Sequence, residues 1–542
     1  MAKRIKSQVK HPVVLKMKQS HFWSFSRFEL LSLLGLFFLA IFIRFLVIKN
    51  NNIFFFFDQS RDATSAYEIT HGHPIKVQGP SASGTGDSVY HGVLYYYVIA
   101  PAYALGNGDP FFASMWLGIL TSFTIFPLFL LAKSVSKSSQ VGYLAAFLFA
   151  ISFEAAQMGT WLSNPGIAVL TLTCFYLFIW RIFYEQRHQE LPLLALFLGL
   201  CNQSIIYSAY LWIILGILYF FNQNRKVGEE PVQFSVKEVT IAIVVYAISI
   251  STMLVNQLLL YKHGLFNPFK TAASVGGLGQ IPFLDLIKQI FELFLKNISY
   301  VFFPTNAILS IILLAVAFIL LKKYSKDVSQ FLWIWYLAPL ALLLFIFRNG
   351  YHVMIGSSPM LYLLLALALH KIWEMKLGKV TAIGIMMFFI VSQLAGGKTL
   401  LTEKKHLAGL QEGTYLQDEM NLIDKTYEIA GGKPFSISSL TIPYGYDTTW
   451  AYLYHWYGLS KYGYLPSYVG STQSGILGSE FLTEKSTTEA IHFSIQEPTQ
   501  GLPEVFNMKF GLDQQALAGT PSAQILYGSL RLQVRDMKSA TP

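Results

Sequence analysis

The chain has 542 residues, of which 53% are hydrophobic and only 13% are charged, and its mean hydropathy is +0.45. Because a soluble protein carries roughly twice that charged fraction, the composition excludes an ordinary soluble domain and predicts a polytopic membrane protein. The net charge of +10 does not indicate a nucleic-acid partner, since the Lys and Arg residues lie between hydrophobic stretches as membrane topology requires. Cys174 and Cys201 lie within hydrophobic stretches and match no metal-binding or redox spacing.

The chain begins with a basic segment, residues 1–27, which we expect in the cytoplasm. The hydrophobic stretch 28–48 that follows is too long for a typical cleaved signal peptide, and no small-residue cleavage site follows it. We therefore expect an uncleaved first transmembrane helix whose N-terminus is cytoplasmic.

About eleven membrane crossings are predicted, because a helix crosses the hydrocarbon core in about 20 residues. They are expected near residues 28–48, 111–132, 140–158, 162–183, 191–206, 207–221, 238–260, 303–322, 329–347, 353–370 and 379–396. The loops predicted on the cytoplasmic side are basic, as with Lys133 and Lys137 or Lys322 and Lys323. The loops 49–110 and 261–302 and the tail after 396 are then extracytoplasmic.

The outside segments contain structure of their own. Ala63–Ile69 and Val89–Leu105 are predicted helices in loop 49–110, joined by a turn-rich segment, residues 79–86. In the loop 261–302, the pattern of Phe283–Leu295 predicts an amphipathic helix in the membrane interface.

The tail, residues 397–542, is predicted to be a small α/β domain. Its patterns indicate a helix over Leu407–Ile429 and strands over Phe435–Leu440, Ala490–Ile495 and Ile525–Val534. The aromatic stretch Trp450–Tyr464 has three open interpretations: stacking on sugars, contact with lipid, or packing of the domain itself. The predicted fold class is thus an all-α polytopic membrane domain, residues 28–396, followed by an extracytoplasmic α/β domain.

A charged cluster follows the first predicted span directly. Four phenylalanines, Phe54–Phe57, are expected to anchor it in the lipid interface, and Asp58, Arg61 and Asp62 come next. If this segment is helical, Asp58 and Asp62 share one face and Arg61 can neutralise either. A helix cap with a surface salt bridge would explain these residues, but ionisable groups beside a membrane favour a functional site.

Five further residues are predicted to face the same side as Asp58: Arg44, His91, Asn164, Arg348 and His352. Arg44 lies near the outer end of the first span, where its side chain can also snorkel to the interface. Asn164 precedes Pro165, which is typical of a plain helix N-terminus. The pair Arg348 and His352 would suit a phosphate. Glu154 is expected near the same outer loop, and Asn297-Ile298-Ser299 matches the glycan-acceptor pattern.

An acidic motif after the first helix, followed by a tyrosine-rich juxtamembrane helix, resembles the membrane glycosyltransferases of the GT-C superfamily. The similar branch includes aminoarabinose transferases, RgtA-type transferases and protein O-mannosyltransferases. The matching stretches are 58–62 (DQSRD), 90–97, 106–110 and 161–165. The resemblance implies that Asp58 is the catalytic acidic residue. Gln59 stands where many members have Glu, so a Mg²⁺ or Mn²⁺ site, with Asp58 and Asp62 as its ligands, stays an open expectation.

The chemistry of such a transfer requires one base. A sugar on a polyprenyl phosphate leaves as a phosphate monoester, whose second pKa is about 6, so the leaving group needs no proton. A glycosidase needs two carboxyls because its leaving alkoxide must be protonated. We therefore expect an inverting transfer with Asp58 as the base, and cations among Arg61, Arg348, His352 and Lys262 for the phosphate. The expected partners are a polyprenyl-phosphate sugar donor, a lipid, glycan or protein acceptor, and the bilayer of the cell membrane.

Two other classes of protein stay open. A multi-pass transporter or flippase would place ionisable residues or broken helices at mid-membrane. A non-catalytic membrane scaffold would leave Asp58 without neighbouring cationic side chains.

Overall fold

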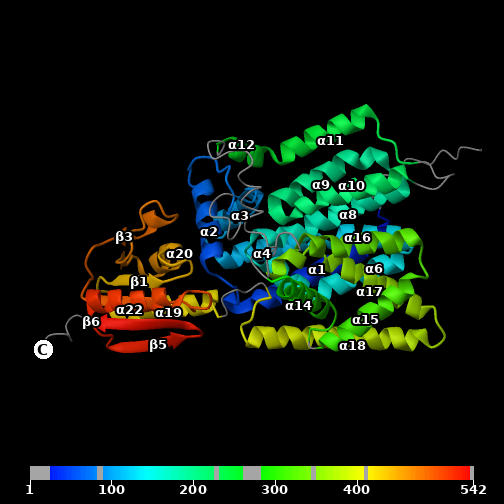
Figure 1. The fold of residues 1–542 in the computed structure, drawn as a ribbon. Coiled ribbons are helices and arrows are strands. Elements are labelled where there is room, and N and C mark those ends of the chain that lie inside the picture. The colour runs from blue at the N-terminus through cyan, green and yellow to red at the C-terminus, as the bar shows by residue number, and fades with distance from the viewer. Residues whose placement is uncertain are drawn as a thin grey trace, which may run out of the picture.

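The computed structural model describes residues 25–81, 89–224, 231–259, 282–304, 306–343, 350–407 and 413–536. A helical domain reaches from α1 to α18, and a smaller domain with a β-sheet lies at one end of its helices (Figure 1). Most of the N-terminal basic segment, together with Lys262 and Arg348, lies outside the described residues.

The helices of this domain lie along the chain close to the predicted positions. Its α-helices are α1 (Arg27–Ile48), α2 (Phe57–Thr70), α3 (Leu94–Leu105), α4 (Pro110–Ser122), α5 (Ile125–Ser136), α6 (Ser139–Ile151), α7 (Phe153–Thr160), α8 (Ala168–Glu185), α9 (Leu191–Ser204), α10 (Tyr210–Gln223), α11 (Val236–Ser249), α12 (Ser251–Leu259), α14 (Phe283–Phe302), α15 (Ala307–Leu321), α16 (Lys326–Leu343), α17 (Ser358–Trp373) and α18 (Gly378–Thr402). The short 3-10 turns used below are η2 (Asn164–Ile167) and η6 (Tyr351–Met354).

Within the described residues, 5 helical segments are long and apolar enough to cross a membrane, or up to 8 if each bent pair counts as one span. The bent pairs are α6 with α7 (61°), α11 with α12 (59°) and α14 with α15 (85°). Each predicted span overlaps one or two helices, so the chain is a multi-pass membrane protein. The number of eleven crossings stays a prediction, because several of these helices are short.

Local sequence explains where these helices begin and bend. The Ser26 hydroxyl accepts a hydrogen bond from the backbone N–H of Glu29, and the Glu29 carboxylate accepts one from the backbone N–H of Ser26, which closes a capping box before α1. Lys133 of α5 lies 2.6 Å from the Glu29 carboxylate and fixes this end of α1. Ser152 interrupts α6 and α7 because its hydroxyl caps the second helix.

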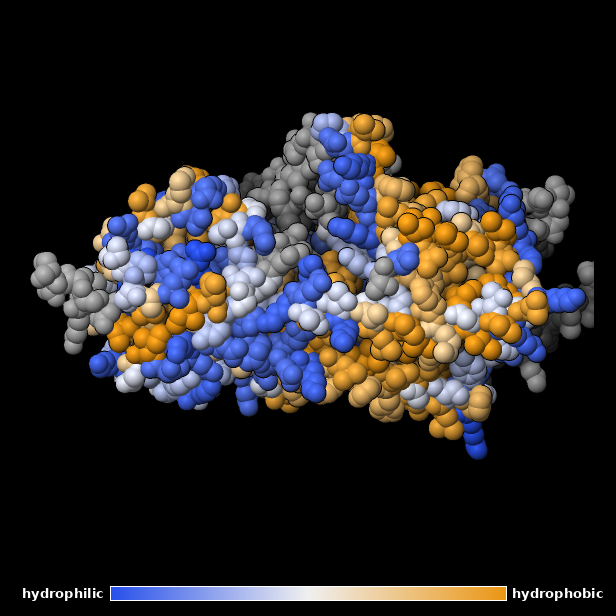
Figure 2. Space-filling model, turned by 90° about the horizontal axis from the view of Figure 1, so that it is seen from below, coloured by the Kyte–Doolittle hydropathy of each residue, from blue (hydrophilic) through white to orange (hydrophobic). Residues whose placement is uncertain are grey.

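The outside of the helical domain is apolar. The space-filling view shows a broad hydrophobic surface over this domain and a mostly polar surface over the sheet domain (Figure 2). Large side chains of α1 and α18, such as Phe28, Phe42, Val380 and Val391, are more than half exposed. Such a surface suits contact with lipid.

The C-terminal domain contains a six-stranded sheet in the order β3-β2-β1-β4-β6-β5. Its strands are β1 (Ser436–Leu440), β2 (Ser467–Tyr468), β3 (Thr483–Glu484), β4 (Ile491–Gln496), β5 (Ala523–Tyr527) and β6 (Leu530–Asp536). The first four run parallel, and the last two form an antiparallel hairpin. A single strand over Ile525–Val534 was therefore a wrong prediction, since the chain turns at Gly528 with φ +56°.

Helices cover both faces of this sheet. Along β1 and β4 the side chains alternate, and Ile437, Phe493 and Ile495 enter the apolar core with α19 (Leu416–Ala430) and α20 (Thr448–Leu453). On the other face lies α22 (Glu504–Ala518), whose Gln514 accepts hydrogen bonds from the sheet, including one of 2.6 Å from Ser494. The sheet is thus apolar on one face and polar on the other.

The phenylalanine run joins the two domains. Phe55 donates its N–H to Thr414 O at 3.1 Å, and Leu416 donates to Ile53 O at 2.9 Å, which makes a short antiparallel bridge. Phe54, Phe55 and Phe56 are buried, and the Phe55 ring lies 6.1 Å from that of Tyr452. The prediction that this run anchors in lipid was wrong, because its side chains pack within the protein.

Two further expectations are decided by burial. Trp450, Tyr452 and Tyr454 are fully buried, so packing explains the first part of the aromatic stretch. Asn297 has no exposed surface and donates to the hydroxyl of Tyr351 at 3.2 Å. The glycan-acceptor pattern at Asn297 is therefore not a usable acceptor in this fold.

Candidate active site at the start of helix α2

The charged cluster occupies the first two turns of α2. Phe56 is extended and α2 begins at Phe57, so Asp58 lies in the first turn, where the unpaired N–H groups favour negative charge. The Asp58 side chain is 38% exposed, whereas that of Asp62, one turn further, is 1% exposed. The two carboxylates share a helix face, as predicted, but only Asp58 is accessible.

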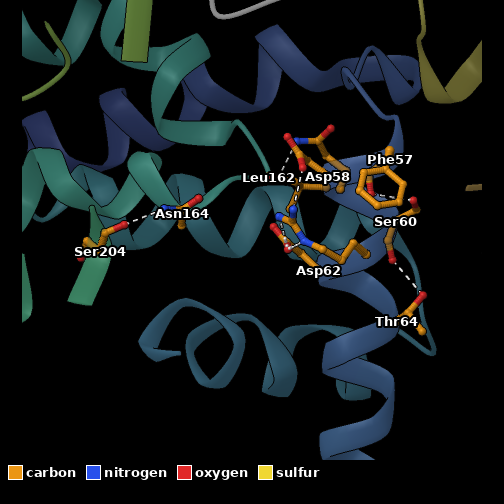
Figure 3. A network of polar contacts seen from close by, with 10 residues as sticks. Phe57, Asp58, Ser60, Asp62, Thr64, Leu162, Asn164 and Ser204 are labelled. Atoms are coloured by element: carbon orange, nitrogen blue, oxygen red, sulfur yellow. Dashed lines mark hydrogen bonds and ion pairs between the residues drawn. The ribbon is translucent and has the colours of Figure 1, made fainter. Parts of the chain in front are cut away.

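Arg61 lies between the two carboxylates (Figure 3). Its Nη1 donates to Asp58 Oδ1 at 2.6 Å, while Nε and Nη2 donate to Asp62 Oδ1 at 2.9 and 2.7 Å. The scaffold interpretation, which required that Asp58 lack a cationic neighbour, is therefore wrong. Charge-assisted hydrogen bonds of this kind fix the orientation of all three side chains.

The two carboxylates differ in what their second oxygens contact. Oδ2 of Asp62 is buried and has no hydrogen-bond partner, and burial raises the pKa of Asp62 to about 7 although Arg61 opposes the shift. Oδ2 of Asp58 also has no partner among the described residues, but it belongs to an accessible side chain. A substrate hydroxyl can therefore reach Asp58, whereas Asp62 serves to hold Arg61.

The neighbours of Asp58 tie α2 to the rest of the protein. Gln59 Nε2 donates to Leu162 O at 2.9 Å, while Gln59 Oε1 is buried and has no hydrogen-bond partner in the part of the chain that the structure describes. The hydroxyl of Ser60 lies 3.1 Å from that of Thr449 in α20. Helix α2 is thus held between the segment before η2 and the C-terminal domain.

The predicted metal ligands, Asp58 and Asp62, each bind the guanidinium of Arg61. A metal site at these two carboxylates stays a prediction. Among the residues that the structure describes, no group of three or more His, Cys, Asp or Glu side chains is placed to hold a metal ion. We therefore derive no step through a metal.

His91 lies near this cluster, and its uncharged imidazole ring can donate a hydrogen bond. Its Nδ1 accepts a hydrogen bond of 3.1 Å from the backbone N–H of Ile206, so the ring proton must be on Nε2. Burial lowers the pKa of His91 to about 3, and the charges of His352 and Arg61 add to the shift. His352 and Arg61 are thus close enough to His91 for their charges to act on it.

His352 comes to this site on η6. Its ring centroid lies 6.3 Å from that of Trp161 and 6.4 Å from that of Tyr207. On the other side of Trp161, at 5.6 Å, lies His406, which also stacks on Phe54 at 5.1 Å. His406 was missed because it stands alone after the last span, with no motif around it.

Two predicted site residues have structural contacts instead. Asn164 Nδ2 donates to Ser204 O at 2.7 Å (Figure 3), and the residue at the cap of η2 is Ser163. Arg44 has no exposed surface and donates to Ala40 O and Ala155 O at 3.2 and 3.3 Å. The alternative that Arg44 snorkels to the interface is therefore excluded by its burial. Arg348 lies outside the described residues.

A buried carboxylate supports the element that carries His352. Glu154 Oε1 accepts hydrogen bonds from Tyr351 at 3.0 Å and Ser358 at 2.7 Å, and Oε2 accepts one from Tyr362 at 3.0 Å. Glu154 is 1% exposed and lies just after the break between α6 and α7. A buried carboxylate needs such donors, so Glu154 joins the broken helix to η6 and α17.

The helices and the C-terminal sheet give this integral-membrane protein a fold that is similar to that of solved structures, as the resemblance predicted. The structure of ArnT from Cupriavidus metallidurans bound to undecaprenyl phosphate matches with a TM-score of 0.55 and 10% sequence identity, over 94% of this chain and 99% of that chain. The same protein in the apo state matches with a TM-score of 0.55 and 11% identity over the same shares.

An Archaeoglobus fulgidus oligosaccharyltransferase in complex with Zn and sulfate is more distant, with a TM-score of 0.45 and 12% identity over 85% of this chain and 67% of that chain. No protein-family model matches the sequence. No curated protein sequence matches it either. The similarity to known proteins therefore concerns the fold, and the activity is inferred from the residues of the site.

Proposed function

We propose that the protein is an integral-membrane glycosyltransferase that moves a sugar from a polyprenyl-phosphate donor to a hydroxyl acceptor on the extracytoplasmic side. The observation that carries this proposal is the accessible carboxylate of Asp58, held by Arg61 at 2.6 Å at the start of a helix outside the membrane spans. The GT-C fold adds to it, since the similar ArnT structure contains undecaprenyl phosphate.

In the proposed reaction Asp58 acts as the general base. Its free Oδ2 takes the proton of the acceptor hydroxyl while the acceptor oxygen forms a bond to the anomeric carbon of the sugar. The bond between that carbon and the phosphate oxygen breaks, and polyprenyl phosphate leaves with the electron pair. One displacement inverts the anomeric configuration, and a positioned base contributes typically about 10² to 10⁴ in rate.

The donors around Asp58 suit a phosphate. Arg61 supplies a fixed positive charge, and the Nε2–H of His91 supplies a neutral donor. His352 is close enough to His91 for its charge to lower the pKa of His91. Arg348, which precedes His352 in the sequence, remains a predicted phosphate ligand. We assign Arg44 and Asn164 to holding the fold, because both donate to backbone carbonyls.

A transporter or flippase is the second candidate, and the three bent helix pairs favour it. The ionisable residue nearest to one of these bends is Glu154, whose two oxygens accept three hydrogen bonds from fixed hydroxyls. A carboxylate so fully bonded suits a structural bend better than a substrate pathway. We therefore place the enzyme first.

The test is a turnover assay on the purified full chain in detergent with a panel of polyprenyl-phosphate sugars. We expect release of polyprenyl phosphate that depends on an added hydroxyl acceptor. A protein in vesicles that moves labelled polyprenyl-phosphate sugar between leaflets, but releases no polyprenyl phosphate, would overturn the proposal in favour of the flippase.

A further inference from the structure

A crevice in the C-terminal domain lies between α22 and the carboxyl ends of β1, β2 and β3. It has a volume of about 400 Å³, which is within the range of small-molecule sites. The sheet side is formed by Ser438, Ser439 and residues 468–471, and the helix side by Phe510, Asp513 and Ala516. Figure 1 shows α22 lying across the sheet beside β1.

The topology of the sheet explains why a crevice opens there. The chain passes from β1 to β2 and β3 on one side, and then crosses to β4 on the other side of β1. In open sheets with parallel strands, ligands bind outside the carboxyl ends of the strands near such a reversal of strand order. The crevice lies at these ends, where β1 continues into Tyr444 and Gly445.

The lining of the crevice is rich in hydroxyls and nearly neutral in charge. The hydroxyls of Tyr444, Ser471 and Ser486 and the carboxylate of Asp513 have no hydrogen-bond partner among the described residues. The cation at the rim, Lys485, already pairs with Glu489 at 2.5 Å. A phosphate would lack a free cation here, and an apolar ligand would leave these polar groups unpaired.

The lining also offers an aromatic surface. The Tyr444 ring lies 4.7 Å from that of Phe506 and borders the crevice, and its pKa is raised by burial and by the nearby charge of Asp513. A half-buried tyrosine beside a carboxylate and free hydroxyls suits a ligand with one apolar face and many hydroxyls. Sugars have this combination of surfaces.

We propose that this crevice binds a saccharide, which is the sugar portion of the acceptor. The assignment to the acceptor rests on the proposed function, whereas saccharide binding itself does not. The loop that borders the crevice also reaches the acidic cluster, because Tyr446 packs on Phe57 with ring centroids 5.7 Å apart. Residues 444–446 therefore connect the crevice with Phe57, the residue that precedes Asp58.

The experiment measures saccharide binding to the purified full chain without any donor, by saturation-transfer NMR and calorimetry. The probes are methyl glycosides of glucose, galactose, mannose and N-acetylglucosamine, with their β-1,4-linked di- and trisaccharides. We expect at least one probe to bind. Asp513→Asn should raise the Kd of that probe by about tenfold or more, because a hydrogen bond to a charged group is lost. Ala516→Trp, which fills the crevice, should abolish binding.

A matched control keeps the outcome clear. Glu504→Gln neutralises an exposed carboxylate on the same helix outside the crevice and should bind as the wild type. Absence of binding by all probes at about 10 mM, or binding that survives both Asp513→Asn and Ala516→Trp, would overturn the inference. Binding in the crevice by a protein that transfers no sugar would support the inference and sink the proposed function alone.

Discussion

Replacement of the proposed base, Asp58→Asn, should abolish most turnover and leave the fold intact. The substitution keeps the size of the side chain and removes its ability to take a proton. A positioned base contributes about 10² to 10⁴ in rate, which corresponds to about 2.7 to 5.4 kcal/mol of activation free energy. The loss of kcat is expected within that range.

The cost in stability should be much smaller. The Asp58 side chain is 38% exposed, and exposed ion pairs contribute about 0.2 to 1 kcal/mol to the free energy of unfolding. Arg61 keeps its two bonds to Asp62, so the guanidinium is not left unpaired. The effect on rate should thus exceed the effect on stability several-fold.

The assay compares polyprenyl phosphate release and thermal unfolding for the wild type, Asp58→Asn and Asp424→Asn. Asp424 is a matched control, because its side chain is 34% exposed and also pairs with a cation, Lys461, at 2.9 Å. Only Asp58→Asn should lose turnover. Full turnover by well-folded Asp58→Asn, or an equal loss in Asp424→Asn, would refute the assignment of the base.

Three further outcomes follow from the structure. Glu154→Gln replaces one of the two accepting carboxylate oxygens by an NH₂ donor, so at least one of the three hydroxyl bonds is lost, and it should lower the free energy of unfolding by about 1.5 to 3 kcal/mol in denaturant titrations, with a smaller loss of kcat than Asp58→Asn; unchanged stability would contradict the network. Phe55→Ala should destabilise by about 3 to 5 kcal/mol and speed proteolytic release of the C-terminal domain, whereas Phe42→Ala, on the exposed face of α1, should not; equal cleavage of both variants would count against the interface. Burial raises the pKa of Asp447 to about 8, so the folded domain holds a proton that the unfolded chain loses near pH 4; stability should therefore fall as pH rises between these values, by up to about 1.4 kcal/mol per pH unit, and Asp447→Asn should flatten that slope in thermal scans.

Local sequence signals were enough to predict part of this architecture. Long apolar stretches and basic loops predicted the membrane domain, because span length and charge depend on the bilayer rather than on tertiary contacts. The spacing of Asp58, Arg61 and Asp62 predicted their shared helix face, since i, i+3 and i+4 neighbours need only one turn of helix.

Contacts between distant segments could not be predicted in this way. The four phenylalanines suggested lipid, but their partner strand, residues 414–416, follows more than 350 residues later. Arg44 suggested the interface, but its Nη2 donates to the carbonyl of Ala155, which lies 111 residues further along the chain. Glu154 likewise acquires its role from Tyr351 and Tyr362, which no spacing in the sequence connects to it.

The bridge between Ile53–Phe55 and Thr414–Leu416 has a consequence for how this protein can be divided. The segment Ile53–Phe55, which precedes Asp58, forms its backbone hydrogen bonds with Thr414 and Leu416 of the C-terminal domain. A chain cut before Thr414 would therefore leave the segment before Asp58 without its backbone partners and the Phe55 ring without its neighbour Tyr452. Exchange of C-terminal domains between related proteins should succeed only when the incoming domain can form the same backbone hydrogen bonds with residues 53–55 that residues 414–416 form here.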